Sequence, residues 1–402
     1  MLGLAPMAGT AATGEAFAKH NPMSDGPLAK GGRDYFKELG VRTFINAAGT
    51  YTSMTATLMR PQTMEAIRYA SDKFCLLDDI QDKVGARIAE ITHAESAVVT
   101  SGAFAALTLG MAGILTGKDP ERIKQIPRLE GTGMKTEVIC QKGHAIGYNQ
   151  AMRNVGVRIV MVETAEELEK AIGPQTAAMF FLHINADRGK IQHEQWVAIA
   201  KKHGIPTMID IAADVPPVSN LWRFNDMGFD LVAISGGKAL RGPQSAGILM
   251  GRKHLIEAAR LSMPPRGETI GRGMKVNKEE ILGMYVALEE FVKIDHDKEY
   301  ALFQKRIDRI KASADQVPGI KTVVRHPTLG NVTPTLDISW DPTRIPSDGN
   351  ALREMLRKGS PSIEVVGGKD NLSITAWSLK EGEDAIVAKR VREVLEQASV
   401  KA

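Results

Sequence analysis

The chain has little of several features that mark specialised protein classes. It holds two cysteines, Cys75 and Cys140, both in apolar sequence surroundings, which excludes a disulfide framework and a cysteine-rich metal site and predicts two buried thiols. It has no block of lysine and arginine, aromatic residues make up 5%, and the formal net charge of +4 is spread along the chain. We therefore expect no nucleic-acid partner, no membrane partner and no bound metal.

What is present has the composition of a soluble enzyme, with 43% hydrophobic and 24% charged residues. The length of 402 residues exceeds the size, about 250–300 residues, at which single cores stop growing. Apolar strand segments alternate with amphipathic helices between residues 97 and 251, which predicts an α/β fold with a mostly parallel sheet covered on both faces. We expect a tail and linker at 1–32, a large domain at 33–295 and a small α+β domain at 296–402.

The N-terminal stretch leaves two interpretations open. Residues 1–18 are small and mildly apolar and end in Ala16-Phe17-Ala18, which matches the small-x-small pattern of a signal cleavage site. One interpretation is a flexible tail in a cytoplasmic protein. The other is the remnant of a twin-arginine signal whose arginines lie upstream of the given start, in which case the mature enzyme is exported to the periplasm.

One lysine stands at the end of a predicted strand. Leu231–Ile234 is aliphatic and leads into Ser235-Gly236-Gly237-Lys238. Burial lowers the pKa of a lysine and makes it a nucleophilic amine, which can hold a carbonyl cofactor as a Schiff base. The alternative is a solvated loop lysine, and an isolated Ser-Gly-Gly-Lys would favour that alternative.

Three upstream segments support the cofactor interpretation of Lys238. The strand Thr207–Asp210 ends in a carboxylate that can pair with a protonated pyridine nitrogen, although Asp210 is equally suited to cap a turn. The strand Ala97–Thr100 is followed by Ser101 and Gly102 at a helix start, which suits either a bound phosphate or a plain N-cap.

The third segment is the strand Val138–Gln141, which is followed by His144. The ring of His144 can stack on a flat cofactor, and the alternative is an ordinary surface histidine. Each of these signals is weak alone. Their order along the chain, with phosphate site, aromatic ring, carboxylate and lysine each at a strand end, favours pyridoxal 5'-phosphate (PLP) as the cofactor.

The combined pattern resembles the fold-type-I PLP enzymes. Within them it is similar to the selenocysteine synthase (L-seryl-tRNA selenium transferase)-like family, including the D-glucosaminate-6-phosphate ammonia-lyase type. The segments that carry the likeness are 41–50, 88–102, 235–238 and 241–244, and it extends from about residue 41 to residue 288.

The resemblance implies roles for particular residues. Lys238 would form the internal aldimine and move the substrate α-proton, Asp210 would hold the pyridinium, and His144 would stack on the ring. The remaining cofactor-binding residues it implies are Ser101, Gly102, Ala103, Ala212 and Ser235. The loop 264–273 would bring Thr269 and Arg272 to the phosphate of a neighbouring subunit in a homodimer or larger homo-oligomer, and the alternative is a mobile surface loop.

The sequence departs from the family pattern in two places. No arginine occurs in 373–378, where an arginine that clamps the substrate carboxylate is expected, and Arg241, Arg353 and Arg357 are substitutes that the sequence does not rank. Only a low-complexity tail precedes Arg33 where a tRNA-binding domain would stand, so a free amino acid or amino sugar acid is the expected substrate.

The resemblance therefore favours α,β-elimination of the ammonia-lyase type. A PLP-dependent racemase, aldolase or aminotransferase is the alternative within the enzyme class. Outside that class, the alternative is a non-catalytic α/β scaffold whose lysine has no chemical role.

Overall fold

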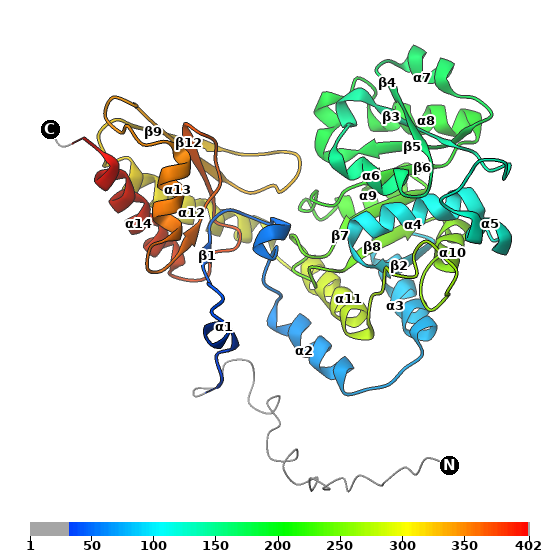
Figure 1. The fold of residues 1–402 in the computed structure, drawn as a ribbon, viewed down its shortest axis with the longest axis horizontal. Helices are drawn as coiled ribbons and strands as arrows, with labels where there is room; N and C mark the ends of the chain where they lie inside the picture. The colour runs from blue at the N-terminus through cyan, green and yellow to red at the C-terminus, as the bar shows by residue number, and fades with distance from the viewer. Residues whose placement is uncertain (1–31, 401–402) are drawn as a thin grey trace, which may run out of the picture. The chain divides into compact units, whose positions relative to one another are not determined.

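A computed structural model describes residues 32–400 of the protein, drawn in Figure 1. The stretch 1–18, with its two interpretations, lies outside the described residues. The contacts within the chain separate the part that ends at Phe44 from the part that begins at Ile45. The described portion of the first part holds one short helix, α1 (Tyr35–Glu38), which begins where the Asp34 side chain accepts the Lys37 N–H. All features below belong to the second part.

A seven-stranded sheet forms the centre of this part, with the order β2-β8-β7-β6-β5-β3-β4. Its strands are β2 (Ser96–Thr100), β3 (Glu137–Gln141), β4 (Arg158–Val162), β5 (Thr176–Leu182), β6 (Thr207–Asp210), β7 (Leu231–Ser235) and β8 (Gly247–Gly251). β8 runs antiparallel to β2 and β7, and the pairs from β7 to β4 are parallel. The predicted α/β class with a mostly parallel sheet is confirmed.

Helices cover both faces of this sheet (Figure 1). They are α3 (Leu77–Thr92), α4 (Gly102–Thr116), α5 (Pro120–Gln125), α6 (Gln150–Arg153), α7 (Ala165–Ala171), α8 (His193–His203), α9 (Asn220–Met227) and α10 (Lys253–Leu261). Because successive strand residues point to opposite faces, neighbours such as Met208 and Ile209 belong to two different apolar clusters. One cluster includes α4, α6 and α10, and the other includes α3, α8 and α9.

This two-sided burial explains the composition of the strands. All seven residues of β5 are buried, and its sequence is an almost unbroken apolar run from Ala177 to Leu182. β5 ends at Leu182, where His183–Arg188 turns into a 3₁₀ helix.

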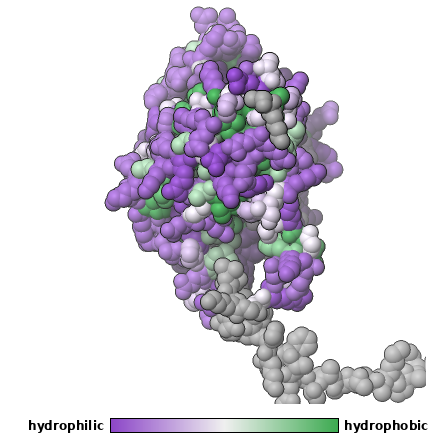
Figure 2. Space-filling view, turned by 90° about the vertical axis from the view of Figure 1, so that its left-hand side faces the viewer, coloured by the Kyte–Doolittle hydropathy of each residue, from purple (hydrophilic) through white to green (hydrophobic). Residues whose placement is uncertain are grey.

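The C-terminal region has the predicted α+β character. A three-stranded antiparallel sheet has the order β12-β10-β9. Its strands are β9 (Ile320–Arg325), β10 (Thr335–Trp340) and β12 (Asn371–Thr375), and its helices are α12 (His296–Ala314), α13 (Gly349–Arg357) and α14 (Glu383–Ala398). The helix α11 (Lys278–Val292) precedes this region and packs against α3. The side of the molecule that carries this region presents mainly hydrophilic residues (Figure 2). The boundary at residue 296 stays a prediction, although α12 begins there.

Two short connections tie the start of this part to the rest. β1 (Ile45–Asn46) pairs in parallel with β11 (Ile363–Glu364), so the chain enters alongside the C-terminal region. α2 (Pro61–Ser71) then packs against α11. Among residues 32–400, no helix is long and apolar enough to cross a membrane.

The two thiols differ in their surroundings. Cys140 lies in β3 and is buried, as predicted, and burial raises the pKa of its thiol to about 12. Cys75 is exposed, so the prediction of a second buried thiol is wrong. It lies between α2 and α3, where the chain runs over the surface with Phe74 and Leu76 also exposed.

Three histidines occupy the apolar cluster behind β5. Nδ1 of His183 and Nε2 of His193 are 2.9 Å apart, and both rings pack against Phe224. His144 is completely buried and meets the ring of Phe181 edge-on. Burial lowers the pKa of His183 to about 3 and the pKa values of His193 and His144 to about 4.

These histidines predict a loss of stability in mild acid. The unfolded chain takes up protons at its histidines below pH about 6.5, while the folded protein does not do so until about pH 4, so the free energy of unfolding falls as the pH falls through this window. The expected slope is about 1 kcal/mol per pH unit for each buried histidine. Thermal unfolding of wild type between pH 7 and pH 4.5 measures it.

His193→Gln should flatten this slope, since glutamine does not titrate and its amide nitrogen can replace Nε2. His254→Gln, at an exposed position, is the matched control and should leave the slope unchanged. An equally steep slope in His193→Gln would show that other groups cause the acid sensitivity.

Candidate active site

The predicted strand-end residues meet at one edge of the large sheet. The register pairs Thr100 with Gly247 and Gly247 with Ser235, which puts the ends of β2 and β7 side by side across β8. Asp210 pairs with Ala233, two residues before Ser235. The carboxyl ends of these strands therefore bring the residues after Thr100, Asp210 and Ser235 together, as expected for a ligand site of an open α/β sheet.

The turn that presents Lys238 is held in place from two directions. A Cβ atom on Gly237 would lie 2.7 Å from Cα of Gln244, so only glycine permits the chain to fold back this closely. The hydroxyl of Thr57 donates to the carbonyls of Gly237 and Lys238, each at 3.0 Å. Thr57 comes from the segment before α2, and nothing in the sequence signalled this contact.

Two carboxylates influence Lys238. Burial lowers the pKa of the Lys238 ammonium, and the negative charges of Asp210 and Asp214 oppose that shift. Burial likewise raises the pKa of Asp210, while the Ala212 N–H, which donates to Oδ1 at 2.8 Å, lowers it. Ala212, which was predicted to bind the cofactor, thus fixes the Asp210 carboxylate through its backbone N–H.

Asp214 is the member of this group that sequence reasoning left out of the site. Burial, reinforced by the charge of Asp210, raises its pKa to about 7. Its Oδ1 accepts the Gly330 N–H at 3.0 Å, and the neighbouring Ala213 carbonyl accepts the Asn331 N–H at 2.6 Å. Asp214 therefore joins the strand edge to the loop between β9 and β10.

The start of α4 offers backbone donors without a side-chain cap. The helix begins at Gly102, whose φ of +86° favours glycine, and the Ser101 side chain makes no capping hydrogen bond. The first amides of α4 therefore keep free N–H groups, including that of Ala103. A Cβ on Gly247 would lie 2.7 Å from the Ala103 nitrogen, so glycine lets β8 approach this turn.

His144 lies deeper than its predicted role requires. Its Nδ1 accepts the Leu182 N–H at 3.3 Å, its buried Nε2 has no described partner, and its ring has no exposed surface. The surface-histidine alternative is therefore wrong, and stacking on the cofactor stays a prediction. Tyr148, four residues further on, is the aromatic residue of this segment that lines the pocket described below.

The loop 264–273 is held on the outside of α3 and α4. Asp78 at the start of α3 binds both Arg260 and Arg266, with oxygen–nitrogen distances of 2.7 and 3.1 Å. The Thr269 hydroxyl donates to the Ser262 carbonyl at 3.0 Å, and Arg272 is half-buried. The interpretation as an unattached surface loop is not favoured, and contact with a neighbouring subunit stays a prediction.

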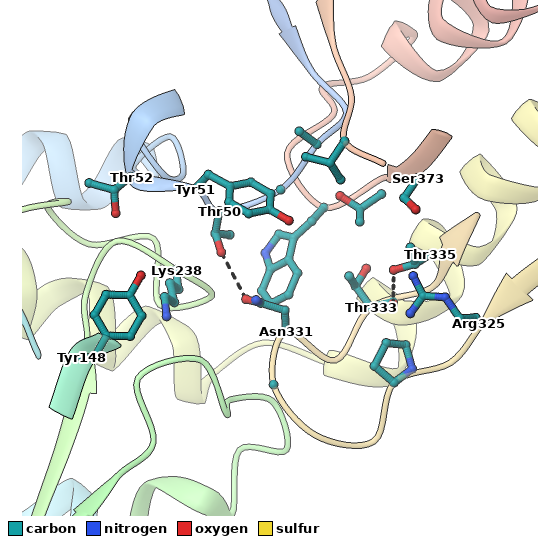
Figure 3. Close-up of a pocket in the computed structure, with 17 residues that line it drawn as sticks. Thr50, Tyr51, Thr52, Tyr148, Lys238, Arg325, Asn331, Thr333, Thr335 and Ser373 are labelled. Atoms are coloured by element: carbon teal, nitrogen blue, oxygen red, sulfur yellow. Dashed lines mark hydrogen bonds between the residues drawn. The ribbon is translucent and has the colours of Figure 1, made fainter. Parts of the chain in front are cut away.

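A pocket of about 420 Å³ opens above Lys238 (Figure 3). It lies between the large sheet and the three-stranded sheet, and its walls come from segments far apart in the sequence. The lining residues are Ala48, Gly49, Thr50, Tyr51, Thr52, Tyr148, Lys238, Arg325, Pro327, Gly330, Asn331, Thr333, Thr335, Val366, Ser373, Thr375 and Trp377. Eight of these carry a hydroxyl group, and no single stretch of sequence predicts such a pocket.

None of the three arginines proposed as carboxylate clamps lines this pocket. Arg353 donates to the Gly368 carbonyl, and Arg357 pairs with Glu364 and Glu354. Arg241 donates to the Trp377 carbonyl at 2.9 Å. Among the described lining residues the arginine is Arg325, at the end of β9, which sequence reasoning did not single out.

These residues fit pyridoxal phosphate. Lys238 is a buried lysine of lowered pKa near two buried carboxylates, Asp210 and Asp214. The Asp210 carboxylate suits a protonated pyridine nitrogen, because an opposite charge stabilises the protonated form. The free first turn of α4, with Ser101 and half-buried Ser235 next to it, offers donors for the phosphate. A lysine, a carboxylate and an anion site are the three groups that this cofactor needs.

Comparison with known proteins agrees with this site. The model of the aminotransferase class-V family matches residues 80–273. The D-glucosaminate-6-phosphate ammonia lyase of Salmonella typhimurium is 27% identical over 90% of this chain and 98% of that protein. The L-seryl-tRNA(Sec) selenium transferase of Moorella thermoacetica is 24% identical over 93% of this chain and 86% of that protein.

A solved structure extends the likeness to the fold. The structure of a D-glucosaminate-6-phosphate ammonia-lyase superposes with a TM-score of 0.79 and 26% identity, covering 91% of this chain and 99% of that one. The protein is a PLP-dependent enzyme of fold type I. Within that class it is similar to the selenocysteine synthase-like enzymes, including the D-glucosaminate-6-phosphate ammonia lyase, as its sequence predicted.

Lys238→Ala should purify without a covalently attached chromophore, while wild type shows a visible absorption band. The reason is that Lys238 is the buried amine at the end of β7 whose pKa is lowered. Borohydride reduction followed by peptide mapping should place the pyridoxyl group on Lys238. Lys190→Ala, which removes an exposed lysine paired with Glu163, should keep the band. A pyridoxyl group on any other lysine contradicts the assignment.

Proposed function

We propose that the protein catalyses α,β-elimination on a free 2-amino-3-hydroxy sugar acid. The substrate loses its α-proton and its β-hydroxyl, the released enamine takes up water, and the products are ammonia and a 3-deoxy-2-oxo acid. The water that leaves in the first stage is regained in the second, so the overall reaction releases ammonia without an oxidant or reductant.

The observation that carries the proposal is the pairing of Lys238 with a hydroxyl-rich pocket. The described lining residues include Lys238 and Arg325 but no aspartate or glutamate, so the pocket suits an anionic ligand. Threonine and serine hydroxyls on several walls match a ligand with many hydroxyl groups. The named activity of the ammonia lyase that matches nearly the whole chain supports the same substrate class.

The residues divide the work between holding the cofactor and moving a proton. When bound, pyridoxal phosphate supplies an aldehyde for an amine and a ring that withdraws electrons from the substrate α-carbon. We assign Lys238 two roles: its amine would hold the cofactor through the aldehyde, and its Nζ would remove the substrate α-proton. Burial lowers the pKa of Lys238, which favours the neutral amine that can accept a proton.

Asp210 and the start of α4 are assigned to the two charged groups of the cofactor, the pyridine nitrogen and the phosphate. We assign the Asp210 carboxylate to the pyridine nitrogen, where its negative charge keeps that nitrogen protonated. The Ala212 N–H fixes the carboxylate orientation at 2.8 Å. Ser101, Gly102, Ala103 and Ser235 are assigned to the cofactor phosphate at the start of α4.

Transamination is less well supported than elimination. An aminotransferase for simple amino acids needs a carboxylate clamp, and β12 carries Ser373 and Thr375 where an arginine is expected. Racemisation needs only the removal and return of the α-proton, so the same Lys238 would suffice for it. Ammonia release separates the two reactions.

Candidate amino sugar acids with a β-hydroxyl, such as D-glucosaminate and its 6-phosphate, should yield equimolar ammonia and 2-oxo acid with the purified enzyme. Asp210→Asn should lower turnover by about 100-fold or more, because a neutral amide does not stabilise the protonated ring nitrogen. Ammonia assay and mass spectrometry measure the products. Deuterium incorporation at the α-carbon without ammonia would indicate a racemase instead.

We further propose that the enzyme acts as a homo-oligomer. Phe74 is 106% exposed and Leu76 is 78% exposed, and Leu58 and Tyr69 in the same segment are also exposed. Large apolar side chains clustered before and after α2 are typical of a surface that a partner covers. A second copy of the chain is the partner we assign, since the predicted contact of Thr269 and Arg272 with a neighbouring phosphate needs one as well.

Light scattering should give at least twice the mass of 43.6 kDa for wild type at micromolar concentration. Phe74→Glu should shift the equilibrium toward the monomer, because it places a charge on the covered surface. Phe36→Glu, at another exposed phenylalanine, is the matched control. A monomeric wild type would contradict the proposal.

A further inference from the structure

The three-stranded sheet presents a polar row to the pocket. The register pairs Thr335 of β10 with both Arg325 of β9 and Thr375 of β12. Side chains opposite one another in neighbouring strands lie on the same face, so the three form one row. All three line the pocket, and Figure 3 shows Arg325 and Thr335 on the side away from Lys238.

Arg325 is oriented by the next row of the same face. Asp337 and Ser373 are opposite one another two residues further along the sheet, and Asp337 pairs with Arg325 through Nε and Nη2. Ser373 also donates to Asp337. Because Asp337 occupies one edge of the guanidinium fork, Nη1 and its two N–H donors remain for a ligand.

Two hydroxyls in the pocket wall lack partners. The Oγ1 atoms of Thr333 and Thr375 are buried and make no described hydrogen bond, and Thr333 is only 1% exposed. Leaving a buried polar group unpaired costs stability, and a ligand in the pocket would supply partners for the two threonine hydroxyls. Asn331 lies next to them, and its side-chain carbonyl accepts the Thr50 hydroxyl at 3.1 Å, which leaves its amide N–H groups for a ligand.

The two cations stand at opposite ends of this polar wall. Figure 3 shows Lys238 on one side of the pocket, Arg325 on the other, and Asn331 and Thr333 between them. A ligand whose amine reaches the Lys238 end therefore passes hydroxyl and amide groups before it meets Arg325.

We propose that Arg325, Thr333 and Thr375 form a subsite for the distal end of the substrate, a hydroxylated chain that terminates in an oxyanion. The inference rests on the proposed function for the position of the amine and adds the group at the other end. The oxyanion is a phosphate ester or a second carboxylate, both of which Arg325 Nη1 can bind. Thr333 and Thr375 donate to, or accept from, the hydroxyls between.

Binding of unreactive analogues tests the subsite without turnover. Gluconate, 6-phosphogluconate and glucarate share a hydroxylated chain, carry no amine and differ in the terminal group. Calorimetry on the PLP-loaded enzyme should show 6-phosphogluconate or glucarate binding at least about tenfold more tightly than gluconate, as a charge-assisted hydrogen bond predicts. The tighter of the two identifies the source of the oxyanion.

Arg325→Gln should bring the affinity for the tighter analogue to within about threefold of that for gluconate, because the charge is lost while gluconate is unaffected. Thr333→Val should weaken all three ligands without changing their order. Arg353→Gln removes an arginine outside the pocket and should behave as wild type. Unfolding temperatures check that each variant is folded.

Two results would overturn the inference. One is a wild type that does not distinguish gluconate from 6-phosphogluconate and glucarate, and the other is a preference that survives in Arg325→Gln. Neither result touches the proposed reaction, which the ammonia assay decides separately. Conversely, loss of the preference in Arg325→Gln supports the subsite even if the enzyme proves to be a racemase.

Discussion

The structure depends on burying one amine between two carboxylates. Lys238 loses hydration at the end of β7, and the same burial raises the pKa values of Asp210 and Asp214. Burying any one of these three charged groups alone would be unfavourable, because removing a charge from water is costly unless an opposite charge is close. Their mutual dependence requires β6 and β7 to be adjacent and in fixed register. The continuous apolar strands and the helices on both faces provide that rigidity.

The pair of carboxylates also joins the two halves of the enzyme. Asp210 ends β6 of the large sheet and accepts the Ala212 N–H, whereas Asp214 accepts the Gly330 N–H of the loop between β9 and β10. The Asn331 side chain in that loop contacts Thr50 and lines the pocket. The charge of Asp210 raises the pKa of Asp214, and Asp214 in turn binds the loop that lines the pocket. The electrostatics at Asp210 and the position of this loop are therefore linked through Asp214.

The sequence predicted the fold and the cofactor because these rest on local signals. The strand before Ser101 and the strands that end in Asp210 and Ser235 are short apolar runs next to small or polar residues, and such local patterns can be recognised in a single sequence. Thr57, Asp214 and Arg325 were missed because their roles depend on contacts with residues more than 100 positions away. Cys75 was misplaced because apolar neighbours such as Phe74 are exposed in this chain. Roles of individual cofactor-binding residues, including His144, remain predictions.

The entry of the chain beside β11 has a consequence for biosynthesis. The Ala47 carbonyl accepts the Thr375 N–H at 2.9 Å, and the pocket wall combines residues 48–52 with residues 366–377. All seven strands of the large sheet and Lys238 are therefore synthesised well before residues 366–377. Residues 48–52 lack their partners in the pocket wall until translation is nearly complete. The residues predicted to hold the cofactor are thus synthesised before the last wall of the pocket.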